Sequence, residues 1–482
     1  MTFNSLAYAI FLPSVFLLYW FVFNKNLKHQ NLFIVAASCL FYGWWDWRFL
    51  GLLVFTAICS WGSGILIDRY RGKGKAPGRI CLLNVLLNLS ILGFFKYFGF
   101  FVRSFCSLFP EIGSDGPVLR IILPVGISFY TFQAIGYTVD VYKGRIAPTK
   151  DLAAFLAFIC FFPQLVAGPI ERSTSLLPQF QHKRDFDGSA AADGLRLILW
   201  GLFKKVVVAD TCARYVDSVF NAAQPQPGSA LLMAILLFSF QIYGDFSGYS
   251  DIAIGSARLF GIRLIRNFNL PFFSQSIPEF WRRWHISLTT WFRDYVYLPL
   301  GGSHGSRLRT IRNTFIVFLA SGLWHGADYT FIVWGAFHAV LFIPAILSGK
   351  RRLPAGIPAA GRFLPGFPDL ARMCLTFLLV SLGWIFFRSE SLAQSWAVFC
   401  RLPAQETLTA AYKLFLLPET RMCSLWAACM LLLEWTGRDR ECPLRFDRVR
   451  TPLLRYVIYT AIVLLIIYTG EPDGTPFIYF QF

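Results

Sequence analysis

Residues 50–67 read LGLLVFTAICSWGSGILI, an unbroken run without a charged side chain. A stretch of about 18 predominantly apolar residues is long enough for a helix to cross the hydrocarbon core of a bilayer. Apolar runs that approach or exceed this length recur at residues 6–23, 80–101, 331–347 and 456–468. The sequence therefore predicts an all-α, polytopic integral membrane protein.

Composition supports this class and argues against two others. Hydrophobic residues make up 56% of the chain and charged residues 15%, whereas a typical soluble domain carries about 25% charged residues. The net charge of +18 comes mostly from arginines and lysines between apolar runs, which is typical of cytoplasmic loops rather than of a nucleic-acid-binding face. The eleven cysteines are scattered and form no CxxC pair, so neither a disulfide framework nor a zinc site is expected.

The positive charges also predict an orientation. Arginine and lysine gather in the segments 68–79, 350–362 and 438–450, and such segments lie on the cytoplasmic side of a membrane. Counting the apolar runs from both ends then places the N-terminus and the C-terminal tail, residues 471–482, outside the cytoplasm.

The middle of the chain is less regular than its ends. The segments 124–138, 161–170, 241–254 and 279–302 are apolar but interrupted by proline, glycine or charge. Non-helical backbone at membrane depth is tolerated where protein buries it or where it lines a cavity. We therefore expect about eleven to thirteen spans and re-entrant helices around a central tunnel, in a single integral membrane domain over residues 1–482.

The segment 279–292, EFWRRWHISLTTWF, is unusually polar for such a protein. Ionisable side chains inside a bilayer are costly unless they face a cavity, a partner or a reaction, and histidine is well suited to proton transfer near neutral pH. Helical spacing places Arg282, His285 and Thr289 on one face and lets Glu279 pair with Arg283. The alternative is an interfacial helix, with Trp281, Trp284 and Trp291 as an aromatic belt.

Three more ionisable residues are candidates for function. His325 stands in SGLWHG beside Trp324; its alternative role is packing, with a hydrogen bond to a carbonyl of the next helix. Asp245 and Asp251 stand in YGDFSGYSD, where they are expected to line a cavity, bond backbone amides at a helix break, or relay protons. No HExxH or nucleophile-elbow motif is present, so no metal site or serine triad is predicted.

Five segments together resemble the membrane-bound O-acyltransferase family, in particular its bacterial alginate O-acetyltransferase branch. They are PVGISFYTFQAIGYTVDVYKG (124–144), FFPQLVAGPIER (161–172), YGDFSGYSDIAIG (243–255), EFWRRWHISLTTWFRDYVYLPLGG (279–302) and SGLWHGADYTFIVWGAFH (321–338). The resemblance extends over nearly the whole chain and identifies residues 124–338 as catalytic core segments.

The resemblance implies a reaction and its participants. His325 corresponds to the catalytic histidine and His285 to a second histidine associated with activity, with Arg282, Arg283, Trp324, Asp245 and Asp251 as candidates for the tunnel lining. An acetyl group would pass from a cytoplasmic donor, acetyl-CoA or another acyl thioester, to an exported polysaccharide, without a tightly bound cofactor. A lipid-embedded enzyme of the bacterial inner membrane is implied, acting with an extracytoplasmic SGNH or esterase-like partner.

The chemistry suggests a division of roles. A neutral imidazole at His325 is expected to take the proton of the acceptor hydroxyl, while His285, with Arg282 or Arg283, orients the acceptor or stabilises the oxyanion. The last six residues, FIYFQF, resemble the C-terminal motif of the small membrane peptide that serves the related D-alanyl transferase. That likeness implies Tyr479 as an acyl relay; the alternative is a hydrophobic tail that fills a groove.

Other functions fit parts of this pattern. Peptidoglycan O-acetylation and D-alanyl transfer to teichoic acid use the same fold, and no residue distinguishes their acceptors. A transporter or flippase would also be polytopic, but it predicts paired repeat halves, and the sequence has no such repeat. A non-catalytic scaffold would tolerate the loss of His325.

Overall fold

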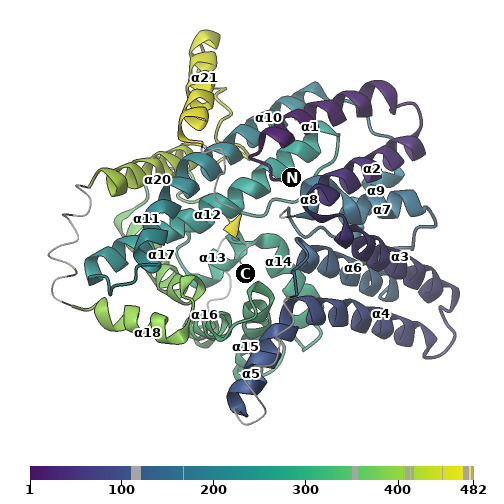
Figure 1. Cartoon of the computed structure of the whole chain (residues 1–482), viewed down its shortest axis with the longest axis horizontal. Coiled ribbons are helices and arrows are strands. Elements are labelled where there is room, and N and C mark those ends of the chain that lie inside the picture. Colours follow the sequence, from purple (N-terminus) through teal and green to yellow (C-terminus); the bar gives the residue numbers. More distant parts are fainter. Residues whose placement is uncertain are drawn as a thin grey trace. The chain divides into compact units, whose positions relative to one another are not determined.

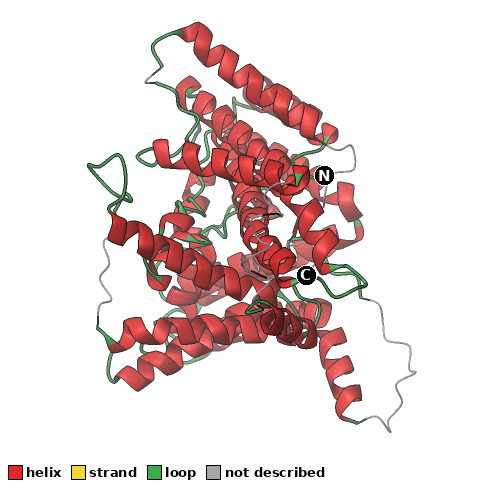
Figure 2. Ribbon diagram, turned by 90° about the vertical axis from the view of Figure 1, so that its left-hand side faces the viewer, coloured by secondary structure: helices red, strands yellow, loops and turns green. Residues whose placement is uncertain are grey.

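The computed structural model describes residues 1–109, 121–166, 168–349, 356–404, 407, 413, 417–447, 449–470 and 477–478. Within these ranges every regular element is a helix, as Figure 2 shows. The prediction of an all-α protein is therefore confirmed. The described residues form two compact units, Met1–Gly194 with Ala253–Ile265, and Leu195–Ile252 with Arg266–Phe482.

Six helical stretches in the described part of the chain are long and apolar enough to cross a membrane. Four of the five apolar runs named from the sequence lie within a helix or a continuous helical stretch, and the fifth, 6–23, extends one residue past the helical stretch Leu6–Val22. The helix at the C-terminal end, α21, has no buried side chain, so its apolar surface needs lipid to cover it. The six stretches are Arg48–Arg69, Ala76–Leu108, Gly228–Leu259, Tyr329–Leu347, Phe367–Arg388 and Pro452–Thr469.

The first unit is built around α6, most of whose side chains are buried against α3 and α4. A polar contact inside this packing joins two helices: Thr138 Oγ1 donates to Asn84 Oδ1 at 2.9 Å. Its elements are α1 (Leu6–Leu17), η1 (Leu18–Val22), α2 (Leu27–Asp46), α3 (Arg48–Arg69), α4 (Ala76–Leu92), η2 (Gly93–Tyr97), α5 (Phe98–Leu108), α6 (Ile127–Tyr142), α7 (Leu152–Cys160), α8 (Phe162–Leu165), α9 (Ser173–Gln181) and the first part of α10 (Gly188–Leu202).

The second unit contains the long antiparallel pair α15 and α16, which run side by side (Figure 1). Helix α17 packs against α16, and α13 contacts both. Its elements are η4 (Phe203–Ala209), α11 (Asp210–Phe220), most of α12 (Gly228–Leu259), η5 (Pro271–Phe273), α13 (Ile277–Arg283), α14 (Ile286–Phe292), η6 (Arg293–Tyr297), α15 (Arg307–His325), α16 (Tyr329–Leu347), α17 (Phe367–Arg388), α18 (Leu392–Arg401), α20 (Pro418–Thr436) and α21 (Pro452–Thr469).

One predicted interruption is wrong. The segment 241–254 is not broken but lies inside α12, a continuous helix of 32 residues. Its glycines serve close packing instead: a Cβ on Gly248 would lie 2.7 Å from the carbonyl oxygen of Gly201 on α10. Small residues that let two backbones approach are typical of helix pairs in membranes. The crossing also brings the lysines that follow Gly201 against the acidic side chains of α12.

Candidate active site

His325 is the last residue of α15, just before the chain turns into α16. The two helices cross closely at Gly322, where a Cβ would lie only 2.2 Å from the carbonyl oxygen of Phe331. The imidazole is 3% exposed, and its ring centroid lies 5.0 Å from that of Trp334 and 5.4 Å from that of Phe387. His325 is therefore held by three helices in an aromatic, water-poor setting.

His285 lies at a break between two short helices. Helix α13 ends at Arg283 and α14 begins at Ile286, and His285 between them has φ 45° and ψ 54°. A non-glycine residue in this left-handed region costs about 1–3 kcal/mol and persists only where its surroundings hold it there. The prediction that Arg282, His285 and Thr289 share one helical face is therefore wrong, because no single helix contains all three.

The backbone around Asn267 holds this break in place. The carbonyl of Asn267 accepts from Ile286 N–H at 2.8 Å, and Asn269 N–H donates to the carbonyl of Arg283 at 2.9 Å. The buried Asn267 side chain adds Oδ1 at 3.1 Å from His285 Nδ1 and 3.3 Å from Ser287 N. The sequence analysis missed Asn267, since an asparagine in a loop between apolar residues gives no periodic or motif signal.

The two histidines, forty residues apart in sequence, lie together in space. Their ring centroids are 6.3 Å apart with the planes at 60°, and His285 is 1% exposed. Trp324 lies beside both, at 5.7 Å from His285 and 4.9 Å from His325. Phe246 of α12 packs edge-on against His285 at 4.6 Å. Two imidazoles in one buried aromatic enclosure are an arrangement suited to proton transfer.

The tryptophans of 279–292 do not form an interfacial belt. Trp281, Trp284 and Trp291 are all buried, with exposures of 5%, 1% and 6%. Trp281 Nε1 donates to Nδ1 of His338 at 3.4 Å, and their rings contact at 5.0 Å. Trp281 contacts Trp334, which contacts His325, and Trp284 contacts Phe268, which contacts His285. His338 has a packing role.

Arg282 and Arg283 differ in their surroundings. Arg283 is buried, pairs with Glu279 at 2.8 Å as the spacing predicted, and donates to the carbonyl of Gly356 at 2.7 Å. It therefore stabilises the fold around α13. Arg282 is exposed and lines a cavity.

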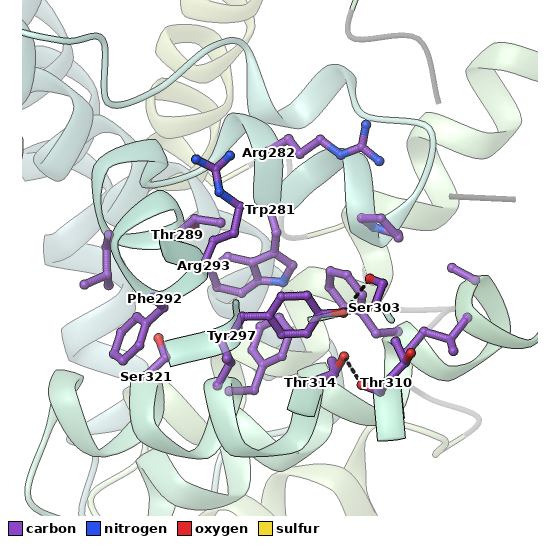
Figure 3. A pocket seen from close by; sticks show the side chains of 17 residues that line it. Trp281, Arg282, Thr289, Phe292, Arg293, Tyr297, Ser303, Thr310, Thr314 and Ser321 are labelled. Carbon is purple, nitrogen blue, oxygen red and sulfur yellow. Dashed lines mark hydrogen bonds between the residues drawn. The ribbon is translucent and has the colours of Figure 1, made fainter. Parts of the chain in front are cut away.

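This cavity has a volume of about 330 Å³ and is mostly apolar. Figure 3 shows the guanidinium groups of Arg282 and Arg293 on the same side of the Trp281 indole. Ser321 lines the cavity too and precedes His325 on α15 by four residues, which is about one helical turn. The cavity therefore has two arginines at its rim, a mostly apolar interior, and a wall formed in part by α15, the helix that ends at His325.

The two acidic residues of α12 form ion pairs with lysines of η4, and all of these side chains are buried except that of Asp251, which is partly exposed. Asp245 contacts Lys205 Nζ at 2.7 Å, and Asp251 contacts Lys204 Nζ at 2.7 Å. Lys205 also pairs with Asp210 at 2.9 Å. Asp245 Oδ2 accepts a hydrogen bond from the backbone N–H of Ile478 at 2.7 Å. A bond to a backbone amide was one of the roles predicted for Asp245, but here the amide does not lie at a helix break.

The sequence analysis did not identify Lys204 and Lys205 as site residues. Two adjacent cations in the apolar run GLFKKVVVA nevertheless indicate buried partners of opposite charge. The contact with Ile478 anchors the C-terminal segment. Phe477 beside it is buried and lies 4.3 Å from Tyr249 and 5.8 Å from Phe246, the residue that packs on His285. Tyr479 lies outside the described residues.

In the part of the chain that the structure describes, no group of three or more histidine, cysteine, aspartate or glutamate side chains gathers where it could hold a metal ion.

The sequence of this chain is similar to those of several known acyltransferases. The chain is 42% identical to the probable alginate O-acetylase AlgI of Pseudomonas aeruginosa over 400 residues, covering 83% of this chain and 74% of that protein. It is 40% identical to the protein of the same name from Azotobacter vinelandii, covering 99% and 87%. It is 38% identical to the peptidoglycan O-acetyltransferase of Helicobacter pylori, covering 79% and 76%.

Residues 146–380, which include both histidines, match the family described as MBOAT, membrane-bound O-acyltransferase. With these relatives and this match, the chain belongs to the membrane-bound O-acyltransferase family.

Proposed function

We propose that this multi-pass acyltransferase moves an acetyl group from a cytoplasmic thioester to a polysaccharide outside the bacterial inner membrane. The relatives named for alginate and peptidoglycan O-acetylation support this acceptor class. The observation that carries the proposal is the buried pair His285 and His325, with ring centroids 6.3 Å apart. Because the chain belongs to this acyltransferase family, we set aside a transporter and a non-catalytic scaffold as its function. We assign the catalytic core to residues 124–338.

The pair supplies the two tasks that acyl transfer requires. One imidazole accepts the proton of the attacking hydroxyl as its oxygen bonds to the acetyl carbon. The other donates to the oxygen or sulfur that gains negative charge while the carbon–sulfur bond breaks. The hydroxyl proton finally leaves on the thiol, so the products are an acetyl ester and a free thiol. The aromatic enclosure keeps water away and so limits hydrolysis.

The cavity beside α13 is the proposed approach of the donor. Acetyl-CoA carries phosphates, an extended pantetheine arm and a small acetyl thioester. Phosphates suit the guanidinium groups of Arg282 and Arg293, and the arm suits the apolar interior that leads past Ser321. The cationic start of α15, RLRTIR at 307–312, is typical of a cytoplasmic end and supports this orientation.

Removing the cationic rim is expected to weaken donor binding. Arg282→Ala and Arg293→Ala should each raise the KM for acetyl-CoA roughly 2-fold to 5-fold, because an exposed charge pair contributes up to about 1 kcal/mol. The effect should shrink at high salt and leave kcat nearly unchanged. Arg307→Ala is the matched control, since Arg307 is exposed but does not line the cavity. An unchanged KM in the double variant would remove the donor from this cavity.

The C-terminal tail is the proposed route of the acetyl group to the outside. Tyr479 directly follows Ile478, whose amide is bonded to Asp245, and Phe477 lies one side chain away from His285. In the proposed sequence the Tyr479 hydroxyl attacks the thioester and becomes an acetyl ester. A serine hydroxyl of an extracytoplasmic SGNH or esterase-like partner then attacks that ester and regenerates the tyrosine. The partner finally acetylates the polysaccharide.

The test is label transfer in reconstituted membranes. With ¹⁴C-acetyl-CoA and no acceptor, the wild-type chain should retain label that hydroxylamine releases, and Tyr479→Phe should retain none. Tyr468→Phe is the matched control, because Tyr468 is 87% exposed on α21. Full labelling and polymer acetylation by Tyr479→Phe would exclude the relay, leaving direct transfer to the acceptor.

Two other acceptors use the same chemistry. The Helicobacter pylori relative favours peptidoglycan as a second candidate at 38% identity. The teichoic acid D-alanyltransferase of Bacillus subtilis is 30% identical but covers only 47% of this chain. Incubating acetyl-labelled membranes with alginate, peptidoglycan and teichoic acid in parallel identifies the acceptor directly.

A further inference from the structure

We infer that Asp245, paired with Lys205, is a positioning residue that fixes the C-terminal segment beside the histidine site. The contact is made to the backbone N–H of Ile478. The consequence for catalysis rests on the proposed relay at Tyr479, whereas the docking is a property of the described residues and can be measured without acyl transfer.

The carboxylate of Asp245 divides its two oxygens between two partners. Oδ1 lies 2.7 Å from Lys205 Nζ, and Oδ2 accepts from the backbone N–H of Ile478 at 2.7 Å. The two side chains are 3% and 1% exposed, and Ile478 is buried as well. Hydrogen bonds to an ionised acceptor are roughly twice as strong as those between neutral groups. The tail is therefore held by a charge-assisted bond in a water-poor place.

The position of Lys205 is set by the element that carries it. The π-helix η4 spans Phe203–Ala209, and π-helical turns occur frequently at functional sites. This turn packs closely on α12, since a Cβ on Gly244 would lie 2.8 Å from the carbonyl oxygen of Lys204. Lys205 Nζ also pairs with Asp210 at 2.9 Å. The ammonium thus balances the charge of Asp245 and leaves its second oxygen for the tail.

The helix α12 connects this anchor directly to the histidine site. Asp245 is followed in sequence by Phe246, whose ring packs edge-on against His285 at 4.6 Å. Phe246 also lies 5.8 Å from Phe477, the residue before Ile478. Two consecutive residues of one helix therefore set the distance between the tail and the histidine site. A fixed distance of this kind is what transfer of a group to the next tail residue requires.

The buried charges are better explained by position than by stability. Taking an ion pair out of water is costly, and well-packed apolar residues in its place are often equally stable or more stable. Apolar side chains, however, cannot accept a hydrogen bond from a backbone amide. An acceptor at one fixed point selects a single register of the tail, and apolar packing alone does not make that selection.

The first test compares two double variants, Lys205→Met/Asp245→Asn and Lys205→Met/Asp245→Leu. Both lack the ion pair, so neither buries an unpaired lysine, and asparagine and leucine are similar in size. Asparagine alone offers an oxygen to the N–H of Ile478. Amide hydrogen exchange at Ile478, localised by mass spectrometry, should be slow in the wild type and in the asparagine variant. It should be at least about 10-fold faster in the leucine variant, because the bond that protects the amide is gone.

The thermal unfolding of the two double variants should be similar, since both have lost the same charges. Fast exchange at Ile478 in the wild-type protein would overturn the inferred anchor. Equal exchange rates in the asparagine and leucine variants would also overturn it, because the acceptor at position 245 would then have no part in docking.

The second test follows labelling of the chain by ¹⁴C-acetyl-CoA. The asparagine variant should label Tyr479 at close to the wild-type rate, and the leucine variant about 10-fold to 10²-fold more slowly, the usual cost of a misplaced reacting group. KM for acetyl-CoA should be unchanged in both, because Asp245 does not line the cavity proposed for the donor.

Equal labelling rates in the asparagine and leucine variants would show that the anchor does not position the reacting residue. A wild-type chain with a protected Ile478 amide and no label on Tyr479 would keep the anchor and remove the relay. Failure of the anchor and failure of the proposed function are therefore distinguished by the exchange measurement.

Discussion

Replacing His325 with alanine is expected to lower kcat for acetyl transfer by about 10²-fold to 10⁴-fold, the usual contribution of a positioned general base. KM for the donor should change little, because His325 does not line the cavity proposed for acetyl-CoA. His325→Gln should recover little, because an amide is not a base at neutral pH. Initial rates of acetyl transfer from labelled acetyl-CoA measure all of these effects.

His182→Ala is the control for His325→Ala, because His182 is exposed in a polar loop. The variants should show wild-type thermal unfolding in detergent, so that the loss can be assigned to chemistry. If His325→Ala transferred acetyl groups at the wild-type rate, His325 would have no catalytic role.

The second large effect is expected at His285. His285→Ala should lower kcat by about 10²-fold to 10³-fold, the usual loss when a donor to developing negative charge is removed. Unlike His325→Gln, His285→Gln should retain part of the rate, because an amide N–H still donates. Added imidazole should partly restore His325→Ala, since it supplies a base to the space that the ring vacates.

Comparing the two glutamine variants separates the roles of the histidines. Greater residual activity in His325→Gln than in His285→Gln would contradict the assignment of His325 as the base. Equal and complete losses in both, with no imidazole rescue of His325→Ala, would also contradict it.

Much of the fold follows from the sequence because the bilayer imposes a strong and simple pattern. An uncharged run such as 50–67 has to be helical and has to be long, and α3 contains it entirely. The segment 241–254 was misjudged because glycine has two opposite uses in a helix. It interrupts a helix where the backbone is free, and it allows close packing where another helix is near, as Gly201 of α10 is near Gly248.

The site was predicted in part. The composition of 279–292 and of SGLWHG drew attention to His285 and His325, since ionisable groups are rare in such surroundings. The break at His285 was not predictable from spacing, because it depends on hydrogen bonds to Asn267, eighteen residues earlier. Lys204 and Lys205 were missed for the same reason: their partners lie on α12 and become neighbours only when the helices pack.

The direct test of acetyl transfer across the membrane through the histidine centre uses sealed vesicles. ¹⁴C-acetyl-CoA is trapped inside proteoliposomes of wild-type or His325→Ala protein, and acceptor polymer with its extracytoplasmic partner is added outside. The account predicts labelled polymer outside the wild-type vesicles, free CoA retained inside, and at least about a 10²-fold lower rate with His325→Ala. Equal labelling of the outer polymer by both proteins, or release of CoA to the outside in step with the label, would contradict it.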